Sequence, residues 1–131
     1  MKKSSSKFQN FTKEVIKLKE GLNQYDSTNE LQRDGIIQRF EFSFELAWKT
    51  LKEIFEEEGL IGLNSPKMVL KEAFSAGIIT EDKIWLNMLM DRNTTSHVYD
   101  EGTAIEICKN IEEKYIEALE KLINKINERE T

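Results

Sequence analysis

The stretch from Glu30 to Glu58, ELQRDGIIQRFEFSFELAWKTLKEIFEEE, decides the fold of this 131-residue chain. Its apolar residues recur every three or four positions and so share one face of a helix; they are Ile36, Ile37, Phe40, Phe44, Ala47, Trp48, Leu51 and Phe55. Phe42, Leu46 and Ile54 lie off that face. Because a helix that is apolar on more than one side must bury each side, we expect a second subunit to cover the extra one. The sequence therefore predicts a homodimer.

Segments on either side of this stretch show the same helical spacing, separated by turn and capping signals. An earlier helix carries an apolar stripe at Phe11, Val15, Leu18, Leu22 and Tyr25. The expected N-caps are Asn29 for the long helix, Ser65 for a short helix over Pro66–Ala76, Thr80 for a fourth helix and Thr103, in a capping box with Glu106, for the last. Gly59 and Gly77 are expected to end the helices that precede them.

No run of residues alternates between apolar and polar as strands do, and there is neither a glycine-rich phosphate loop nor an internal repeat. We predict an all-α protein: an antiparallel up-and-down four-helix bundle with one additional short helix, assembled as a homodimer. The length favours a single domain, expected over residues 8–128. Residues 1–7, with three serines and three lysines, are expected to form a disordered tail.

The composition indicates in which cellular compartment the protein is expected. The net charge is −5. The single cysteine, Cys108, lies among isoleucines at helical spacing, so we expect its side chain to be a buried small hydrophobe. No segment approaches the roughly 20 apolar residues of a membrane span. Together with the absence of paired cysteines, this predicts a cytoplasmic protein without membrane contact. We expect no DNA partner.

The residues that carry chemistry lie in Asp91–Asp100, which reads DRNTTSHVYD and contains the only histidine of the chain. On a continuous helix, Arg92 and Tyr99 would nearly superimpose in angle, whereas His97 would lie about 140° from Arg92. The three side chains meet only if the helix ends between them, or if a second subunit completes the site. β-branched residues in Thr94–Val98 favour an end there.

An arginine and a histidine this close together suit phosphoryl transfer within RNA. Arginine presents a fork of donors to a phosphate, and histidine exchanges a proton near neutral pH. The residues alone also allow a structural role for His97, because a histidine near a helix end commonly caps it. A metal site is disfavoured, since a single histidine beside Asp91, Asp100 and Glu101 lacks ligand spacing.

Two stretches resemble a known family. Arg92–Tyr99, RNTTSHVY, resembles the Arg-x4-His-x-Tyr signature of the HEPN superfamily, including the asparagine directly after the arginine. Asp34–Leu51, DGIIQRFEFSFELAWKTL, is similar to the long-helix pattern of its branch of nucleotidyltransferase substrate-binding proteins. With Ser65-Pro66 and the segment from Ala73 to Gly77, the resemblance covers about residues 8 to 125.

The resemblance implies a homodimeric helical bundle encoded beside a small minimal nucleotidyltransferase, with which it associates. In related toxin-antitoxin pairs the HEPN protein is a metal-independent RNase toxin, and the partner silences it by transferring AMP to the signature tyrosine. Carried over, Arg92 would hold the scissile phosphate, His97 would exchange protons, Asn93 would orient the site and Tyr99 would accept the nucleotidyl group. No cofactor is implied.

Charge argues against strong RNA binding by the chain alone. Phosphate contacts depend on cations, and this chain is acidic, with Asp91, Asp100 and Glu101 around the motif. Phe42, Glu45 and Lys49 are candidates for a dimer or partner interface, although Glu45 and Lys49 also have the spacing of an ordinary exposed ion pair. Three functions follow: a subunit bound by a nucleotidyltransferase, an active RNase toxin, and a purely structural helical dimer.

Overall fold

The computed structural model describes residues 5–130, and their fold is all-α, as the sequence predicts. The helices are α1 (Ser6–Gln24), α2 (Glu30–Glu57), α3 (Pro66–Ser75), α4 (Asp82–Thr95) and α5 (Glu101–Asn110), which continues through the π-helical turn η1 (Ile111–Tyr115) into α6 (Ile116–Glu130). Residues 1–4 of the expected N-terminal tail lie outside the described residues, and Ser5 caps α1 by accepting a hydrogen bond from the Phe8 amide.

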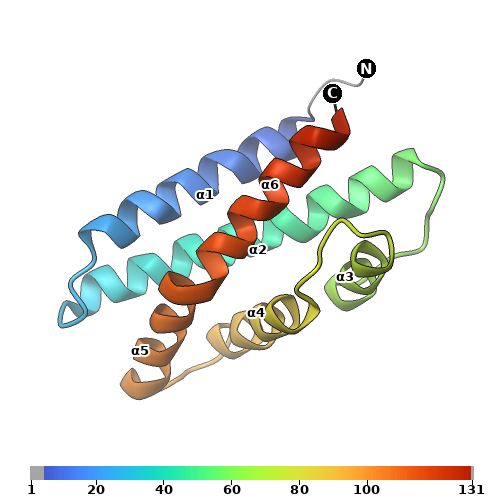
Figure 1. The fold of residues 1–131 in the computed structure, drawn as a ribbon. Coiled ribbons are helices and arrows are strands. Elements are labelled where there is room, and N and C mark those ends of the chain that lie inside the picture. Colours follow the sequence, from blue (N-terminus) through green and yellow to red (C-terminus); the bar gives the residue numbers. More distant parts are fainter. Residues whose placement is uncertain (1–4, 131) are drawn as a thin grey trace.

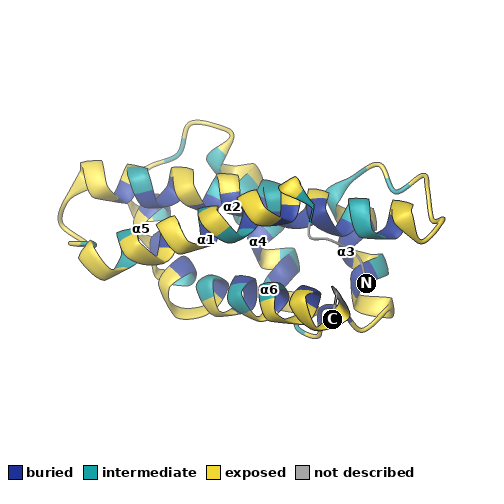
Figure 2. Cartoon of the chain, turned by 90° about the horizontal axis from the view of Figure 1, so that it is seen from above, coloured by how far each residue is buried: buried dark blue, intermediate teal, exposed yellow. Residues whose placement is uncertain are grey.

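Helix α2 is the centre of the arrangement (Figure 1). It packs side by side with α1 along its length, and it also contacts α3, α4 and α5. Each helix turns its buried positions inward and its exposed positions to the outside (Figure 2). This pattern follows from apolar spacing of three and four residues, which gathers most apolar side chains of a helix on the sides that face the core.

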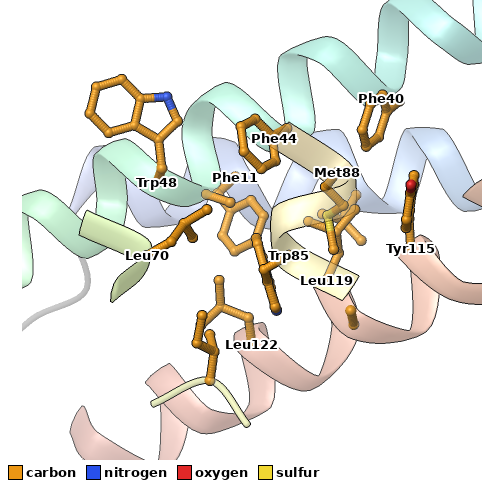
Figure 3. Packing of buried hydrophobic residues seen from close by; sticks show 14 of the residues in the cluster. Phe11, Phe40, Phe44, Trp48, Leu70, Trp85, Met88, Tyr115, Leu119 and Leu122 are labelled. Carbon is orange, nitrogen blue, oxygen red and sulfur yellow. The ribbon is translucent and has the colours of Figure 1, made fainter. Parts of the chain in front are cut away.

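The core is continuous between α2, α4 and the helical rod formed by α5, η1 and α6 (Figure 3). The Phe44 ring lies 6.3 Å from the ring of Trp85 on α4, and the Phe40 ring stacks 5.4 Å from that of Tyr115 at the end of η1. Large aromatic side chains bury much apolar area, so these pairs fix how α4 and η1 sit on α2. Of the residues off the main face of α2, Leu46 and Ile54 pack partly on the core, whereas Phe42 remains 50% exposed.

Most of the predicted helix ends are confirmed. Asn29 caps α2 by accepting from the Gln32 amide, and Ser65 caps α3 by accepting from the Met68 amide. Gly59 and Gly77 follow α2 and α3 with φ angles of 92° and 77°. Left-handed backbone of this kind favours glycine, which explains why both helices end where they do.

Thr80 was the wrong cap for α4. The helix begins at Asp82, and Glu81 occupies the N-cap position without a side-chain cap bond. Ile78 and Ile79 are buried just before it, so the chain from Gly77 to Thr80 anchors the α3–α4 turn in the core. The Glu81 carboxylate instead binds the Lys121 ammonium of α6 at 2.9 Å.

Thr103 was also wrong as the cap of the last helix. Asp100 takes that position, because its Oδ1 accepts a hydrogen bond from the Thr103 amide at 2.6 Å and α5 begins at Glu101. A carboxylate is a strong N-cap and is also stabilised by the positive end of the helix dipole. The hydrogen bond of Asp100 correspondingly lowers the pKa of its carboxyl group.

A buried arginine ties the start of α5 to the α1–α2 turn, and the sequence did not predict it. Arg33 is only 3% exposed. Its NH1 donates to the Ser27 carbonyl at 3.0 Å and its NH2 to Glu101 Oε2 at 3.1 Å. Buried charges need such partners, so the loop before α5 is held in a defined place. Cys108 is buried beside it, as expected, and burial raises the pKa of its thiol.

Two glycines give a matched test of this description of α2. Gly35 lies inside the helix, and a Cβ added there meets no atom within 4 Å. Gly35→Ala is therefore expected to raise the free energy of unfolding by about 0.5–1 kcal/mol, because alanine loses less backbone entropy on entering a helix. Gly59→Ala, at a positive φ, is expected to lower it by about 1 kcal/mol. Urea unfolding measures both, and a destabilised Gly35→Ala would contradict the helix interior.

Candidate functional site

The signature segment straddles the end of α4, as predicted from its β-branched residues. The helix ends at Thr95, Ser96 is the C-cap, and residues 96–100 form the loop to α5. The Ser96 hydroxyl donates to the Asn93 carbonyl at 2.6 Å and the His97 amide donates to the Thr94 carbonyl at 3.1 Å. These short local bonds satisfy carbonyl groups that the helix end leaves free.

Arg92 lies in the last turn of α4 and points toward α2. Its NH2 donates to Glu45 Oε1 at 2.6 Å, and its NH1 lies 3.3 Å from Asn93 Oδ1. The second oxygen of Glu45 lies 3.2 Å from the Lys49 ammonium. One carboxylate of α2 therefore binds two cations, and four of the predicted residues meet at a single ion cluster, which we call the Arg92 cluster (Arg92, Asn93, Glu45 and Lys49).

The cluster keeps Glu45 ionised. Partial burial is the largest single effect on its carboxyl group and raises its pKa. The indole of Trp48, the ammonium of Lys49 and the guanidinium of Arg92 together outweigh burial, so the pKa lies below its ordinary value. Glu45 is therefore negatively charged at neutral pH and neutralises part of the positive charge that a phosphate would need.

A second contact fixes the end of α4 on the same helix. The Thr95 hydroxyl lies 2.7 Å from Glu41 Oε2 and 2.8 Å from the Arg92 carbonyl oxygen. Glu41 and Glu45 are one turn apart on α2, so both carboxylates face the last turn of α4. The end of α4 is thus attached to an acidic edge of α2.

Tyr99 lies beyond the loop and packs partly buried against the core. Burial raises the pKa of its phenol, and the negative charges of Asp34 and Glu41 raise it further. The hydroxyl is therefore neutral at physiological pH, and a reaction at its oxygen requires a base to remove the proton.

His97 is exposed, and so is Val98 beside it. Among residues 5–130, no hydrogen bond or ion pair joins the imidazole to Arg92 or to Tyr99. One chain thus brings Arg92, Asn93, Glu45 and Lys49 together but leaves His97 on the loop surface. Phe42 lies on the outer side of α2, three residues before Glu45, and is half exposed.

A polar cluster beneath the signature was not identified from the sequence. Asp91 Oδ2 accepts hydrogen bonds from the Tyr115 hydroxyl at 2.6 Å and from Asn110 Nδ2 at 3.2 Å. From the sequence, Tyr115 was one member of an apolar stripe and Asp91 one of several surface acids. A tyrosine inside an otherwise aliphatic stripe was the only available signal, because a buried hydroxyl needs a partner.

Concave surfaces occur elsewhere on the chain. A groove of about 500 Å³ lies between α1 and α6, and one of about 300 Å³ lies between α3 and α4 over Trp85. Within the described residues, no three side chains of His, Cys, Asp or Glu are placed to hold a metal ion. None of the helices in residues 5–130 is long and apolar enough to cross a membrane.

The all-α fold, with an Arg-x4-His-x-Tyr segment crossing the end of α4, defines a protein of the HEPN class. The chain belongs to the family described as nucleotidyltransferase substrate binding protein like, whose sequence profile matches residues 6–128. The resemblance seen in the sequence is thereby confirmed for nearly the whole chain.

Individual relatives agree with this placement. A protein of Haemophilus influenzae named probable ribonuclease HepT is 34% identical over 88 residues, which make up 64% of this chain and 60% of that protein. A crystal structure of a Thermus thermophilus protein is similar with a TM-score of 0.77 and 35% identity, over 88% of this chain and 97% of that one. An H. influenzae structure is described as the fold of a substrate binding domain of a nucleotidyltransferase; its TM-score is 0.69 at 25% identity, over 93% of this chain and 95% of that one.

The Arg92 cluster makes stability depend on acid in a testable way. Because the pKa of Glu45 is depressed in the folded chain, its ion pairs stabilise the fold above the ordinary carboxyl value of 4.5 and are lost as pH falls below it. Glu45→Gln is expected to lower the free energy of unfolding at pH 7 by up to about 1 kcal/mol, the range of partly exposed ion pairs. At pH 3.5 to 4 the difference in the free energy of unfolding between Glu45→Gln and the wild type should be smaller than at pH 7.

Urea unfolding at both pH values measures this effect. Glu113→Gln, on the exposed side of η1, removes the same charge and is the matched control. If the difference between wild type and Glu45→Gln were the same at both pH values, Glu45 would not be held in its charged form by Arg92 and Lys49.

Proposed function

We propose that this chain is the HEPN subunit of a two-component system, that it pairs with a small minimal nucleotidyltransferase, and that the enzyme transfers AMP to Tyr99. The observation that carries the proposal is the family match over residues 6–128 together with the Arg92–Tyr99 segment. The description of the H. influenzae structure as a nucleotidyltransferase substrate-binding domain supports the choice of partner.

The chemistry of Tyr99 supports the same assignment. In the proposed transfer, the phenol oxygen attacks the α-phosphorus of a nucleoside triphosphate, a tyrosyl O–P bond forms and pyrophosphate leaves. The phenol proton goes to a base of the nucleotidyltransferase, because the pKa of Tyr99 is raised and its charged neighbours Asp34 and Glu41 disfavour phenolate. The subunit is thus a substrate that depends on its partner for reaction.

A homodimer of up-and-down bundles is the proposed assembly. Phe42 is half exposed on the outer side of α2, next to Glu45 and Lys49, and an exposed aromatic side chain among such residues suits an interface. The exposed position of His97 fits a site that a second subunit completes. Toxin-antitoxin pairing and a cytoplasmic location are part of the same proposal.

Co-expression with the neighbouring nucleotidyltransferase tests the assignment. We expect one mixed complex in size-exclusion chromatography and an intact-mass increase of one AMP on this chain. Tyr99→Phe should abolish the mass increase and leave the complex intact, because only the acceptor hydroxyl is removed. Tyr25→Phe, at the C-cap of α1, is the control and should be modified like the wild type. Two proteins that elute separately would count against the pairing, and an increase that survives Tyr99→Phe would count against the acceptor.

A second function, metal-independent RNA cleavage, is favoured by the relative named probable ribonuclease HepT and by the Arg92–His97 spacing. Arg92 would contact the scissile phosphate, Asn93 would orient the site, and His97 would take the proton of the 2′-hydroxyl or protonate the leaving 5′-oxygen. An RNA phosphate must displace the Glu45 carboxylate, which lies 2.6 Å from Arg92, or share the Arg92 guanidinium with it. AMP on Tyr99 would add negative charge and bulk to this surface and oppose RNA binding.

Cleavage of RNA in excess chelator tests this second function. The wild type is expected to cut, whereas His97→Ala and Arg92→Ala should lose roughly 100-fold or more, because each removes a group that acts at the phosphate. An equimolar mixture of the two variants, unfolded and refolded together, should regain part of the activity if each site uses residues of both subunits. Equal cleavage by wild type and His97→Ala would remove the histidine from the mechanism, and a purely structural dimer would show no cleavage in any sample.

A further inference from the structure

Asp91 and Arg92 are adjacent on α4 but point in different directions. The Arg92 guanidinium reaches out to Glu45 of α2, whereas the Asp91 carboxylate turns toward the helical rod of α5, η1 and α6. Neighbouring residues on a helix differ by about 100°, so the direction of one constrains the direction of the other. Contacts that hold Asp91 therefore fix the rotation of the last turn of α4, and with it the side of the helix from which the Arg92 side chain leaves.

Asp91 is held from the interior. The Tyr115 hydroxyl donates to Asp91 Oδ2 at 2.6 Å, and Asn110 donates to the same oxygen at 3.2 Å. Tyr115 is 1% exposed, and its ring stacks on Phe40 of α2 at 5.4 Å with 21° between the planes. Figure 3 shows Tyr115 and Phe40 facing each other. One side chain therefore contacts both helices that form the Arg92–Glu45 pair.

The π turn explains how two donors reach one oxygen atom. In a regular α-helix, Asn110 and Tyr115 are five residues apart and lie about 140° from each other. In η1 the Ile116 amide bonds to the Ile111 carbonyl, an i to i+5 bond that widens the turn. Residues five apart then come close to the same side, and both side chains can point at Asp91. Turns of this kind are frequent at functional sites.

The protonation state of Tyr115 supports a permanent role as donor. Burial raises the pKa of its phenol well above the ordinary value, and the hydrogen bond to Asp91 raises it further. The hydroxyl therefore keeps its proton at physiological pH. The bond to Asp91 does not switch with physiological pH.

We propose that Tyr115 and Asn110 are positioning residues: acting through Asp91, they fix the last turn of α4 so that the Arg92 guanidinium is held at one place and angle beside Glu45. This inference rests on the proposed role of Arg92 at a phosphate, and it adds three residues that act without touching RNA. A reactive cation on an unsupported helix end would sample many directions, whereas supporting contacts of this kind keep a side chain in productive geometry.

The test follows Arg92 itself. The chain contains four arginines, so the Nε–Hε signals of their side chains can be resolved by nuclear magnetic resonance and assigned with Arg92→Lys. In Tyr115→Phe, which removes only the hydroxyl, the Arg92 signal is expected to shift and broaden. Tyr25→Phe makes the same chemical change away from Asp91, Asn110 and Tyr115 and should leave the signal unchanged. An unchanged Arg92 signal in folded Tyr115→Phe overturns the inference.

RNA measurements on the same variants separate this inference from the proposed function. We expect kcat for RNA cleavage to fall roughly 10- to 100-fold in Tyr115→Phe and in Asp91→Ala with KM little changed, because misplacing a catalytic group chiefly affects the reaction step. Asp91→Asn keeps an acceptor for Tyr115 and should recover part of the activity. If the wild type neither binds nor cuts RNA, the proposed role of Arg92 at a phosphate is wrong. The positioning of Arg92 by Tyr115 is then decided by the Arg92 signal in Tyr115→Phe alone.

If Tyr115→Phe does not fold, Asn110→Ala provides the second variant, since it removes only the longer of the two bonds to Asp91. A smaller shift of the Arg92 signal is expected there, and Asn124→Ala, on α6 away from Asp91, is its control. Equal spectra of Asn110→Ala and wild type, together with equal cleavage, would overturn the positioning role of Asn110 and Tyr115.

Discussion

Burial of the broad apolar face of α2 is the constraint on which the rest of the structure depends. Helices α1, α3, α4 and α5 all pack on it, because apolar side chains spread over more than one side of the helix cannot be covered by one neighbour. The same helix presents Glu41 and Glu45 at its polar edge, where the last turn of α4 is attached. Packing in the core and geometry at the signature are therefore set by one element.

Electrostatics at this edge determine how the Arg-x4-His-x-Tyr signature of this acidic chain would meet a phosphate. Arg92 is not a free cation in the isolated chain, since Glu45 neutralises it at 2.6 Å, and the carboxylate is in turn shared with Lys49. A phosphate would compete with a charged group that is already in place, which weakens nonspecific attraction to RNA. A protein that recognises the loop from Ser96 to Asp100 meets no such competition. In our proposal, this competition between Glu45 and phosphate favours the role of the chain as a substrate of the nucleotidyltransferase. Cleavage is then the activity of an assembled and unmodified dimer.

The sequence predicted the helices well and the contacts between them poorly. Asn29, Ser65, Gly59 and Gly77 act locally, on the few residues next to them, so their roles could be inferred from neighbours alone. Thr80 and Thr103 matched the same local rules and were wrong, because burial of Ile78 and Ile79 and the stronger cap at Asp100 decided the ends of those helices. The buried Arg33 was missed because its partner Glu101 is 68 residues away in the chain, beyond the reach of local rules.

By itself, the sequence determined the all-α class, the end of α4 within the signature and the residue types available for chemistry, because helical periodicity and β-branched residues act over a few positions. Only the tertiary structure decided that Arg92 meets Glu45, that His97 stays on the surface, and that Asp91 is held by Tyr115 and Asn110. Those outcomes depend on which faces of α2, α4 and η1 come together. Pairing of faces is set by the fit of the whole core, and no short stretch of sequence contains it.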